Sequence, residues 1–291
     1  MVAPMTRRVC AVIAALLSVA VGLAGAPAHV AEAQPAPSER SRPAGPPTPD
    51  TCYWTERAFQ DLPELGPGRA KGVILWSHGQ DASGRPNWQY GAPPVIRLFA
   101  DTGWDVILVQ RNERCQGRWV EKGGEYVSNL VSQVRLAKQN GYRRVLVAGH
   151  SVGAGTALGA AGVSSDIDGV LAFALSHGRS GCRDPRTFMP QMIAFHEREI
   201  RNGIEQNRAP RILICMGKDD HCVGHSFTPL VSSALAATGR AYIHFDETMA
   251  IAGHGAANTG KFARLYGKCI REFFDRTDSP APGRHVCAES E

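Results

Sequence analysis

Six short apolar runs, each separated from the next by a segment with helical spacing, constrain the fold of this chain more than any other feature. The runs are apolar on both faces, which is typical of parallel strands that helices cover from each side. They comprise residues 72–78, 104–110, 143–149, 168–175, 210–217 and 241–245. The helical segments comprise residues 94–101, 124–140, 152–162, 187–206, 227–238 and 260–274. This alternation predicts an α/β fold, with a mostly parallel sheet flanked by helices on both faces.

The third apolar run ends in the motif GHSVG, residues 149–153. A G-x-S-x-G motif between a strand and a helix is the pattern of a nucleophile elbow. A serine at such a turn has a strained backbone, and the strand and helix approach so closely that Gly149 and Gly153 are needed to prevent a collision. The helix amino end also favours developing negative charge. Ser151 is therefore the candidate nucleophile.

The loops after the fifth and sixth apolar runs offer the partners that a serine nucleophile requires. Serine is a weak nucleophile and needs a base, which in turn needs an orienting carboxylate. The fifth run is followed by Asp219 and Asp220, and the sixth is followed by His254. Reactive groups of a parallel sheet gather beyond the carboxyl ends of its strands. We therefore expect one of the two aspartates and His254 to lie at the same sheet edge as Ser151.

These motifs resemble those of the α/β-hydrolase superfamily, and within it the smaller bacterial esterases similar to dienelactone hydrolase and polyester-degrading enzymes. The resemblance extends from the first apolar run to the last helical segment. The segment after the fourth apolar run, residues 176–188, is short, so we expect a small or absent lid. Relatives carry the acid in a pattern like G-x-x-D-x-x-V, which here fits Gly217, Asp220 and Val223 and selects Asp220 over Asp219. The short G-H-G context of the family histidine matches "AGHG" and selects His254.

The oxyanion that forms when a serine attacks a carbonyl needs two preorganised N–H donors. The amide of Val152, directly after the nucleophile, is one candidate. The resemblance implies that the second follows the H-G pair in "SHGQDASG", which makes it the amide of Gln80. Trp88 and Trp119 lie on segments with turn chemistry. Both are candidates to line an acyl pocket, and covering the core is the equal alternative.

A metal site is the alternative interpretation of the loop after the fifth run. His221 and His225 have i, i+4 spacing and lie close to Asp219, an arrangement that suits a metal ion. However, the loop also contains Cys222 and shows no helical pattern that would hold this spacing. We therefore expect no metal and no cofactor.

The amino-terminal segment indicates where the protein works. Two arginines precede a short apolar run, residues 9–23, and small residues follow, as in a secretory signal peptide rather than a membrane anchor. Three A-x-A cleavage sites are present, and we favour the one that ends at Ala33. The expected organisation is a signal peptide (1–33), a disordered Pro/Ala-rich tether (34–50) and an α/β-hydrolase domain (51–291). We therefore expect the protein to be periplasmic or secreted and not stably inserted in a membrane.

Charge and cysteine content refine this prediction. After the expected cleavage, 30 basic and 26 acidic side chains remain, and no basic stripe supports nucleic-acid binding. Seven cysteines also remain, and an oxidising compartment lets them pair. Candidate pairs are Cys182 with Cys222 and Cys269 with Cys287. Cys215 lies in an apolar run, where a buried free thiol is the ordinary outcome.

Together these features predict an exported serine hydrolase that cleaves carboxylic esters through a Ser-Asp-His triad and an acyl-enzyme intermediate. Its partner would be a small-molecule ester or other acyl substrate. Two alternatives remain open at this point. One is an acyltransferase that uses the same triad and passes the acyl group to an alcohol. The other is a non-catalytic binding protein on a hydrolase scaffold.

Overall fold

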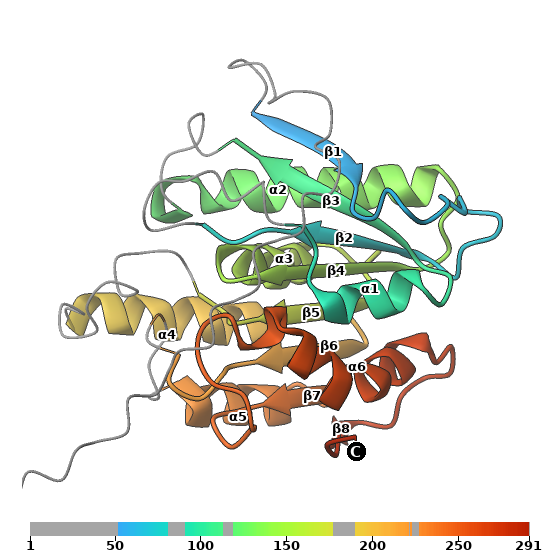
Figure 1. Ribbon diagram of the computed structural model, residues 1–291. Coiled ribbons are helices and arrows are strands. Elements are labelled where there is room, and N and C mark those ends of the chain that lie inside the picture. The colour runs from blue at the N-terminus through green and yellow to red at the C-terminus, as the bar shows by residue number, and fades with distance from the viewer. Residues whose placement is uncertain are drawn as a thin grey trace, which may run out of the picture. The chain divides into compact units, whose positions relative to one another are not determined.

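One eight-stranded sheet forms the centre of the protein in a computed structural model (Figure 1). The strand order is β1-β3-β2-β4-β5-β6-β7-β8, and every neighbouring pair is parallel except β1 with β3. The strands are β1 (Tyr53–Arg57), β2 (Val73–Ser77), β3 (Asp105–Arg111), β4 (Val145–His150), β5 (Gly169–Phe173), β6 (Arg211–Cys215), β7 (Ala241–Phe245) and β8 (Gly283–Arg284). The six strands β2 to β7 coincide with the six apolar runs.

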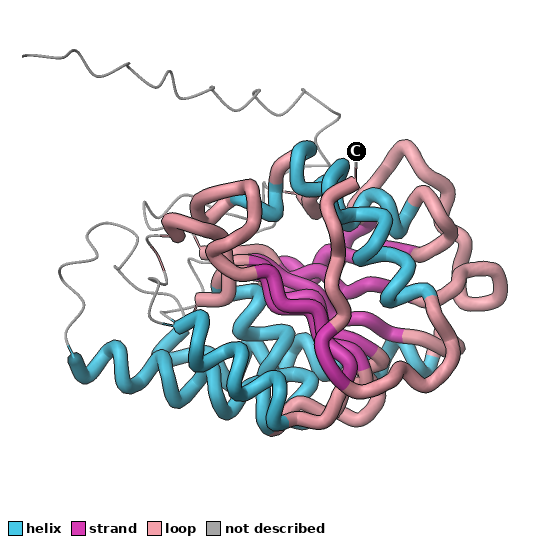
Figure 2. The backbone as a smooth tube through the Cα atoms, turned by 90° about the horizontal axis from the view of Figure 1, so that it is seen from below, coloured by secondary structure: helices cyan, strands magenta, loops and turns pink. Residues whose placement is uncertain are grey.

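Helices cover both faces of the sheet, as Figure 2 shows. The helices α1 (Pro94–Ala100) and α6 (Gly260–Asp275) pack on one face, and a short 3-10 helix, η4 (Ala256–Asn258), precedes α6. The other face carries α2 (Trp119–Gln139), α3 (Val152–Val163), α4 (Pro190–Glu205) and α5 (Thr228–Ala237). The predicted α/β fold is therefore confirmed. Among the helices that the structure describes, none has both the length and the apolar character needed to cross a membrane.

The structure describes residues 52–80, 91–112, 119–176, 190–220, 222 and 227–290. All of them belong to one unit, Pro47–Glu291. The expected signal peptide and the whole of the expected tether lie outside the described residues, and so does nearly all of the segment after β5 on which the expectation about a lid depends.

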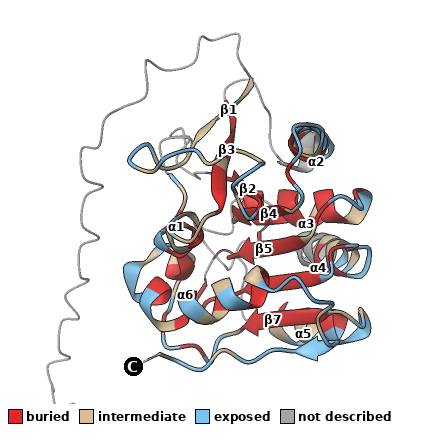
Figure 3. Cartoon of the chain, turned by 90° about the vertical axis from the view of Figure 1, so that its right-hand side faces the viewer, coloured by how far each residue is buried: buried red, intermediate tan, exposed pale blue. Residues whose placement is uncertain are grey.

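The core consists of two apolar layers, one on each side of the sheet. Figure 3 shows that the central strands β2 to β7 are almost wholly buried, while the outer faces of the helices are exposed. One layer lies under α2 to α5 and the other under α1 and α6. Each large apolar side chain that is fully buried contributes about 1.5–3 kcal/mol to the free energy of folding. The two layers explain why the strands are apolar on both faces.

Three elements differ from the sequence-based expectation. Helix α2 begins at Trp119, five residues before the expected start, because two consecutive glycines in "EKGGEY" indicated a loop although the packed helix continues through them. Strand β1 was not predicted. It is an antiparallel edge strand whose residues are only partly buried, so its sequence YWTER lacks the apolar run that marks the other strands. Strand β8 has two residues, too few for a pattern.

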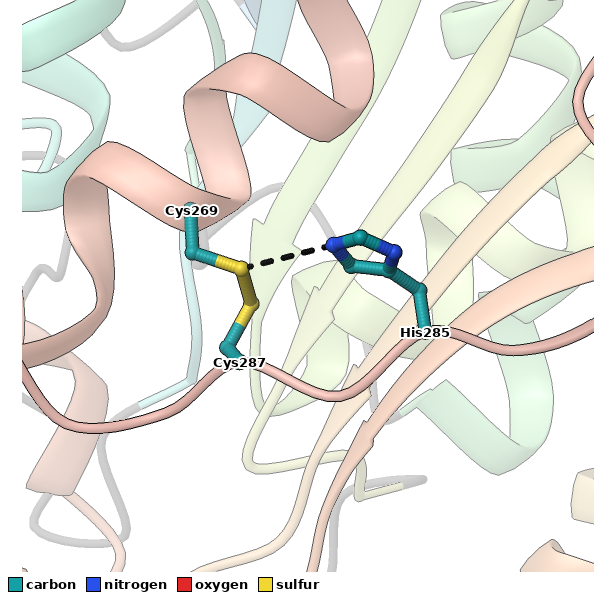
Figure 4. The surroundings of a disulfide bond; sticks show 3 residues. All are labelled: Cys269, His285 and Cys287. Atoms are coloured by element: carbon teal, nitrogen blue, oxygen red, sulfur yellow. Dashed lines mark hydrogen bonds between the residues drawn. A yellow bond between two sulfur atoms is a disulfide. The ribbon is translucent and has the colours of Figure 1, made fainter.

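A disulfide attaches the carboxyl-terminal tail to α6. Cys269 on the helix is joined to Cys287 on the tail, as predicted (Figure 4). The imidazole of His285 lies beside this bond, with Nε2 3.6 Å from Sγ of Cys269. The amide of His285 donates to Tyr242 O at 2.7 Å, which extends the β7–β8 pairing. The tail therefore covers the end of the sheet that β7 would otherwise expose.

The remaining expectations about cysteines are met in part. Cys215 is a buried free thiol, as predicted, and its burial raises the pKa of the thiol. Cys222 is disulfide-bonded, and its expected partner Cys182 lies outside the described residues.

Candidate active site

The order of the strands brings two loops together at the carboxyl edge of the sheet. Strand β2 lies between β3 and β4. After β2 the chain therefore adds β3 on one side of it and then crosses over to add β4 on the other side. A reversal of this kind is the usual place for a site in an open α/β sheet. Ser77, at the end of β2, pairs with Gly149 in β4. The loop after β2 and the loop after β4 therefore leave the sheet side by side.

Ser151 occupies the turn between β4 and α3 with a strained backbone. Its φ is 56° and its ψ is −118°, a conformation that costs a residue with a side chain about 1–3 kcal/mol. The neighbouring glycines make this turn feasible. A Cβ on Gly149 would lie 2.3 Å from the carbonyl carbon of Gly153, and a Cβ on Gly153 would lie 2.0 Å from Ser77 O. The expected reason for the two glycines is thus confirmed.

Asp220 and His254 come from different loops and form a hydrogen-bonded pair. Nδ1 of His254 lies 2.9 Å from Oδ1 and 3.0 Å from Oδ2 of Asp220. The carboxylate is buried, and its Oδ1 also accepts a hydrogen bond from the amide of Cys222 at 2.9 Å. A proton on Nδ1 that is donated to this carboxylate leaves the lone pair of the neutral ring on Nε2. The pair therefore has the geometry of a base and its orienting acid.

The loop that carries His254 returns across the sheet edge toward β4. Two strands, β5 and β6, separate β7 from β4, yet His150 Nε2 donates to His254 O at 2.8 Å and the two imidazole rings are 4.9 Å apart. Gly217 permits this route, because a Cβ there would lie 2.7 Å from Gly253 O. His254 is thereby held next to the residue that precedes Ser151.

Burial keeps His150 neutral. Removal from water, together with the nearby imidazole of His254, lowers the pKa of His150 to about 4. A neutral ring can donate through Nε2 to a carbonyl without placing a positive charge beside His254. His150 therefore positions the backbone of His254 and has no charge of its own near neutral pH.

The two proposed oxyanion donors belong to segments that adjoin Ser151. Helix α3 begins at Val152, so the amide of Val152 has no acceptor within the helix. Gln80 follows Gly79, and a Cβ on Gly79 would lie 3.2 Å from Cβ of Ser151. The turn that carries the Gln80 amide is therefore in contact with the elbow.

The other candidate residues are placed as follows. Trp88 lies outside the described residues. Trp119 is the first residue of α2, and its side chain is not among those described. Asp219 occupies the turn before Asp220 with φ 55°, and it is Asp220 that contacts His254. Cys222 lies close to the Asp220–His254 pair, but its sulfur is in a disulfide and is not available as the thiolate that a metal ion would need.

Arg111 also belongs to this region, although it was not among the predicted site residues. Arg111 is the last residue of β3 and is buried, and its guanidinium contacts the turn that leads to Gln80. The signal that could have identified it is a charged residue directly after the second apolar run, residues 104–110. The turn chemistry of the residues that follow predicted a loop from Arg111 onward.

The fold can be compared with those of known proteins. No family model matches the chain, and no curated protein is similar to it in sequence. Its fold is similar to that of a puromycin-hydrolyzing peptidase from Mycobacterium tuberculosis (TM-score 0.53, 16% identity), over 82% of this chain and 40% of the peptidase. It is also similar to an acylaminoacyl peptidase from Pyrococcus horikoshii (TM-score 0.51, 14% identity), over 79% of this chain and 40% of the peptidase.

A third similar structure is an esterase from Pyrococcus furiosus (TM-score 0.51, 15% identity), over 71% of this chain and 83% of the esterase. The chain thus spans about two fifths of the length of the two peptidases and about four fifths of the esterase. These neighbours are α/β-hydrolases, so the predicted α/β-hydrolase fold is confirmed.

Proposed function

We propose that this chain is an exported serine hydrolase that cleaves carboxylic esters of small molecules by way of an acyl-enzyme. One observation carries the proposal: a strained serine at a strand–helix turn shares a sheet edge with a histidine that is hydrogen-bonded to a buried carboxylate. A backbone strain of about 1–3 kcal/mol persists where the surrounding structure maintains it, commonly at functional sites. The similarity to an esterase and to peptidases supports hydrolase chemistry on this fold.

In the proposed acylation, the hydroxyl oxygen of Ser151 attacks the substrate carbonyl while Nε2 of His254 accepts the hydroxyl proton. Asp220 stabilises the imidazolium that forms and keeps Nδ1 protonated. The tetrahedral intermediate collapses when His254 returns the proton to the leaving alcohol. Water then attacks the acyl-enzyme with the help of the same base, which releases the acid and restores the serine.

The amides of Val152 and Gln80 are the proposed donors to the oxyanion in both steps. They come from two different loops, so they converge only because β2 and β4 are neighbours. Loss of one such donor typically costs about 2.7–4 kcal/mol of transition-state stabilisation.

A fluorophosphonate probe tests this proposal directly, because it phosphonylates only a serine whose hydroxyl is activated. We expect labelling of the wild-type protein, none in Ser151→Ala, and a strong decrease in His254→Ala. Ser164, a buried serine at the end of α3, offers a matched control, and Ser164→Ala should be labelled like the wild type. Labelling that survives Ser151→Ala would contradict the choice of nucleophile.

Substrate class requires a second measurement. Rates on p-nitrophenyl esters, thioesters and peptides distinguish esterase from peptidase activity. Glycerol or a glycan added to the reaction shows whether the acyl group passes to an alcohol, which is the acyltransferase alternative. A protein that reacts with neither the probe nor any of these substrates would support the binding-protein alternative. Recovery of a chain cleaved after Ala33 from the periplasm or medium would support export.

A further inference from the structure

Arg111 is a buried cation that binds the turn between β2 and Gln80. Its side chain begins at the end of β3 and is 3% exposed. Nη2 donates to His78 O at 2.6 Å and to Gly79 O at 2.7 Å, and Nη1 donates to Ser77 Oγ at 3.1 Å. A single guanidinium therefore contacts three consecutive residues of this turn. Charge-assisted hydrogen bonds of this kind are roughly twice as strong as neutral ones.

The peptide unit between Gly79 and Gln80 links Arg111 to the proposed oxyanion site. The described part of the chain contains no cis peptide bond, so the carbonyl of Gly79 and the N–H of Gln80 point in opposite directions. Since Arg111 holds the carbonyl, the N–H must point away from the guanidinium. Gly79 is at the same time in contact with Ser151. Fixing the carbonyl thus fixes the direction of the amide beside the elbow.

His78 adds a second donor to the same carbonyl. Its Nδ1 lies 2.7 Å from Gly79 O, and its Nε2 accepts from the backbone amide of Arg111 at 3.3 Å. These two contacts require a neutral ring with its proton on Nδ1. Burial and the charge of Arg111 lower the pKa of His78 well below its ordinary value, in agreement with that tautomer.

We propose that Arg111 is a positioning residue, which holds and polarises the Gly79–Gln80 peptide so that the Gln80 amide donates more strongly to the oxyanion. This inference rests on the proposed function, because it assigns a role in that reaction. Two donors on a carbonyl draw electron density from the peptide and strengthen its N–H as a donor. The positive charge under the turn also favours the negative charge that develops only in the transition state.

If Arg111 had a purely structural role, its loss would lower stability without a specific effect on kcat. Arg144 is the matched control for such a role. Arg144 is also partly buried, donates to the carbonyls of Phe274, Asp275 and Arg276, and stacks on Trp104 with its Cζ 4.9 Å from the ring centroid. Arg111 stacks on Tyr126 in the same way at 5.0 Å. Arg144, however, precedes β4 and lies at the opposite edge of the sheet from Ser151.

The experiment compares Arg111→Met, Arg111→Lys and Arg144→Met in the full-length protein. It measures Tm, kcat and KM for a p-nitrophenyl ester, and the inhibition constant of a trifluoromethyl ketone, whose tetrahedral adduct places an oxyanion in the site. For Arg111→Met we expect kcat to fall about tenfold to a hundredfold with KM little changed, because an interaction specific to the transition state is lost. The inhibition constant should rise by a similar factor. Arg111→Lys keeps the charge and should recover part of both losses.

Arg144→Met should lower Tm while kcat and the inhibition constant stay at their wild-type values. If Arg111→Met does not fold, Arg111→Lys decides, and wild-type kcat and inhibition in that variant would overturn the inference. Unchanged kcat and inhibition in Arg111→Met would do the same. Such a result, together with loss of probe labelling in Ser151→Ala, would leave the proposed function standing. Persistent labelling in Ser151→Ala would instead overturn the proposed function itself.

Discussion

The two edges of the sheet differ in how much left-handed backbone strain they retain. Among the described residues, the non-glycine residues with positive φ are Ser151, Ala174 and Asp219, and all three follow strands at the carboxyl edge. Turns that enter strands at the amino edge use glycine for the same purpose, as at Gly103 and Gly239. Glycine adopts positive φ without a steric penalty. Strain that one edge avoids is therefore retained at the other, where the proposed site lies.

Each edge holds a buried aspartate whose carboxylate is hydrogen-bonded, so a satisfied buried acid does not by itself distinguish the edges. At the amino edge the carboxylate of Asp105 accepts from the amides of Leu65 and Gly66 and from the hydroxyl of Tyr142. At the carboxyl edge Asp220 is bound by His254. The difference lies in what the bound partner does: Tyr142 is a structural donor, whereas His254 has a second nitrogen available for chemistry.

The largest expected effect separates these two buried aspartates. Asp220→Asn should lower kcat about 10⁴-fold, since an amide no longer enforces the required tautomer of the base, as in the serine protease triad. Asp105→Asn should lower Tm and leave kcat unchanged. Asp219→Asn should lower kcat far less than Asp220→Asn. Steady-state kinetics with a p-nitrophenyl ester and thermal melts check all three. An equal loss of kcat in Asp105→Asn would remove the distinction between the edges.

The next effect concerns glycines that are needed for different reasons. In Gly153→Ala the new Cβ would lie 2.0 Å from Ser77 O, so β2 and α3 must move apart, and we expect a loss of more than about 4 kcal/mol in the free energy of unfolding. Gly239 has φ 64° and open space around it, so Gly239→Ala should cost only about 1–2 kcal/mol of backbone strain. Urea unfolding measures both. Similar losses for the two variants would show that close approach is not what Gly153 provides.

The sequence allowed the fold and much of the site to be predicted because the signals are local. Apolar periodicity located β2 to β7, and the G-x-S-x-G motif located a turn whose glycines have the expected contacts. The choice of Asp220 over Asp219 needed the resemblance to a family pattern, since adjacent carboxylates look alike in a sequence. Arg111 was missed because its role depends on which strands are neighbours: it contacts residues more than thirty positions away. Strand β1 was missed because a partly buried edge strand has no apolar run to mark it.

Acid should destabilise the carboxyl edge, because two of its histidines, His78 and His150, are neutral in the folded protein. The pKa of His150 is lowered from 6.5 to about 4, so below pH 6.5 the unfolded chain binds a proton that the folded protein does not. Stability therefore falls as the pH drops from 6.5 toward 4, and His150 accounts for at most about 3 kcal/mol of this fall. His78 contributes in the same direction.

The measurement is the free energy of unfolding in urea at several pH values between 7 and 4. His150→Gln keeps an N–H that can reach His254 O but does not titrate, so the fall in stability should be shallower in this variant than in the wild type. An identical dependence on pH would show that His150 is not the source of the effect.

The smallest expected effect tests strain at a residue that takes no part in the proposed chemistry. Ala174 follows β5 with φ 49°, and its amide donates to Cys215 O at 2.7 Å. Ala174→Gly relieves a left-handed strain of about 1–2 kcal/mol and gives back about 0.4–1 kcal/mol through the more flexible unfolded chain. We therefore expect a gain in stability of about 0.5 kcal/mol.

Ala172, a buried residue of the same strand, is the matched control. It has an extended backbone, so Ala172→Gly relieves no strain and should cost about 0.5–1 kcal/mol. Urea unfolding gives the sign of the change in the free energy of unfolding for each variant. A gain in Ala174→Gly and a loss in Ala172→Gly would support retained strain at the carboxyl edge. A loss in both variants would mean that the left-handed conformation at Ala174 costs little. The edges would then differ only in the chemistry of their side chains, and Ser151 would be the one strained residue left to distinguish them among those compared.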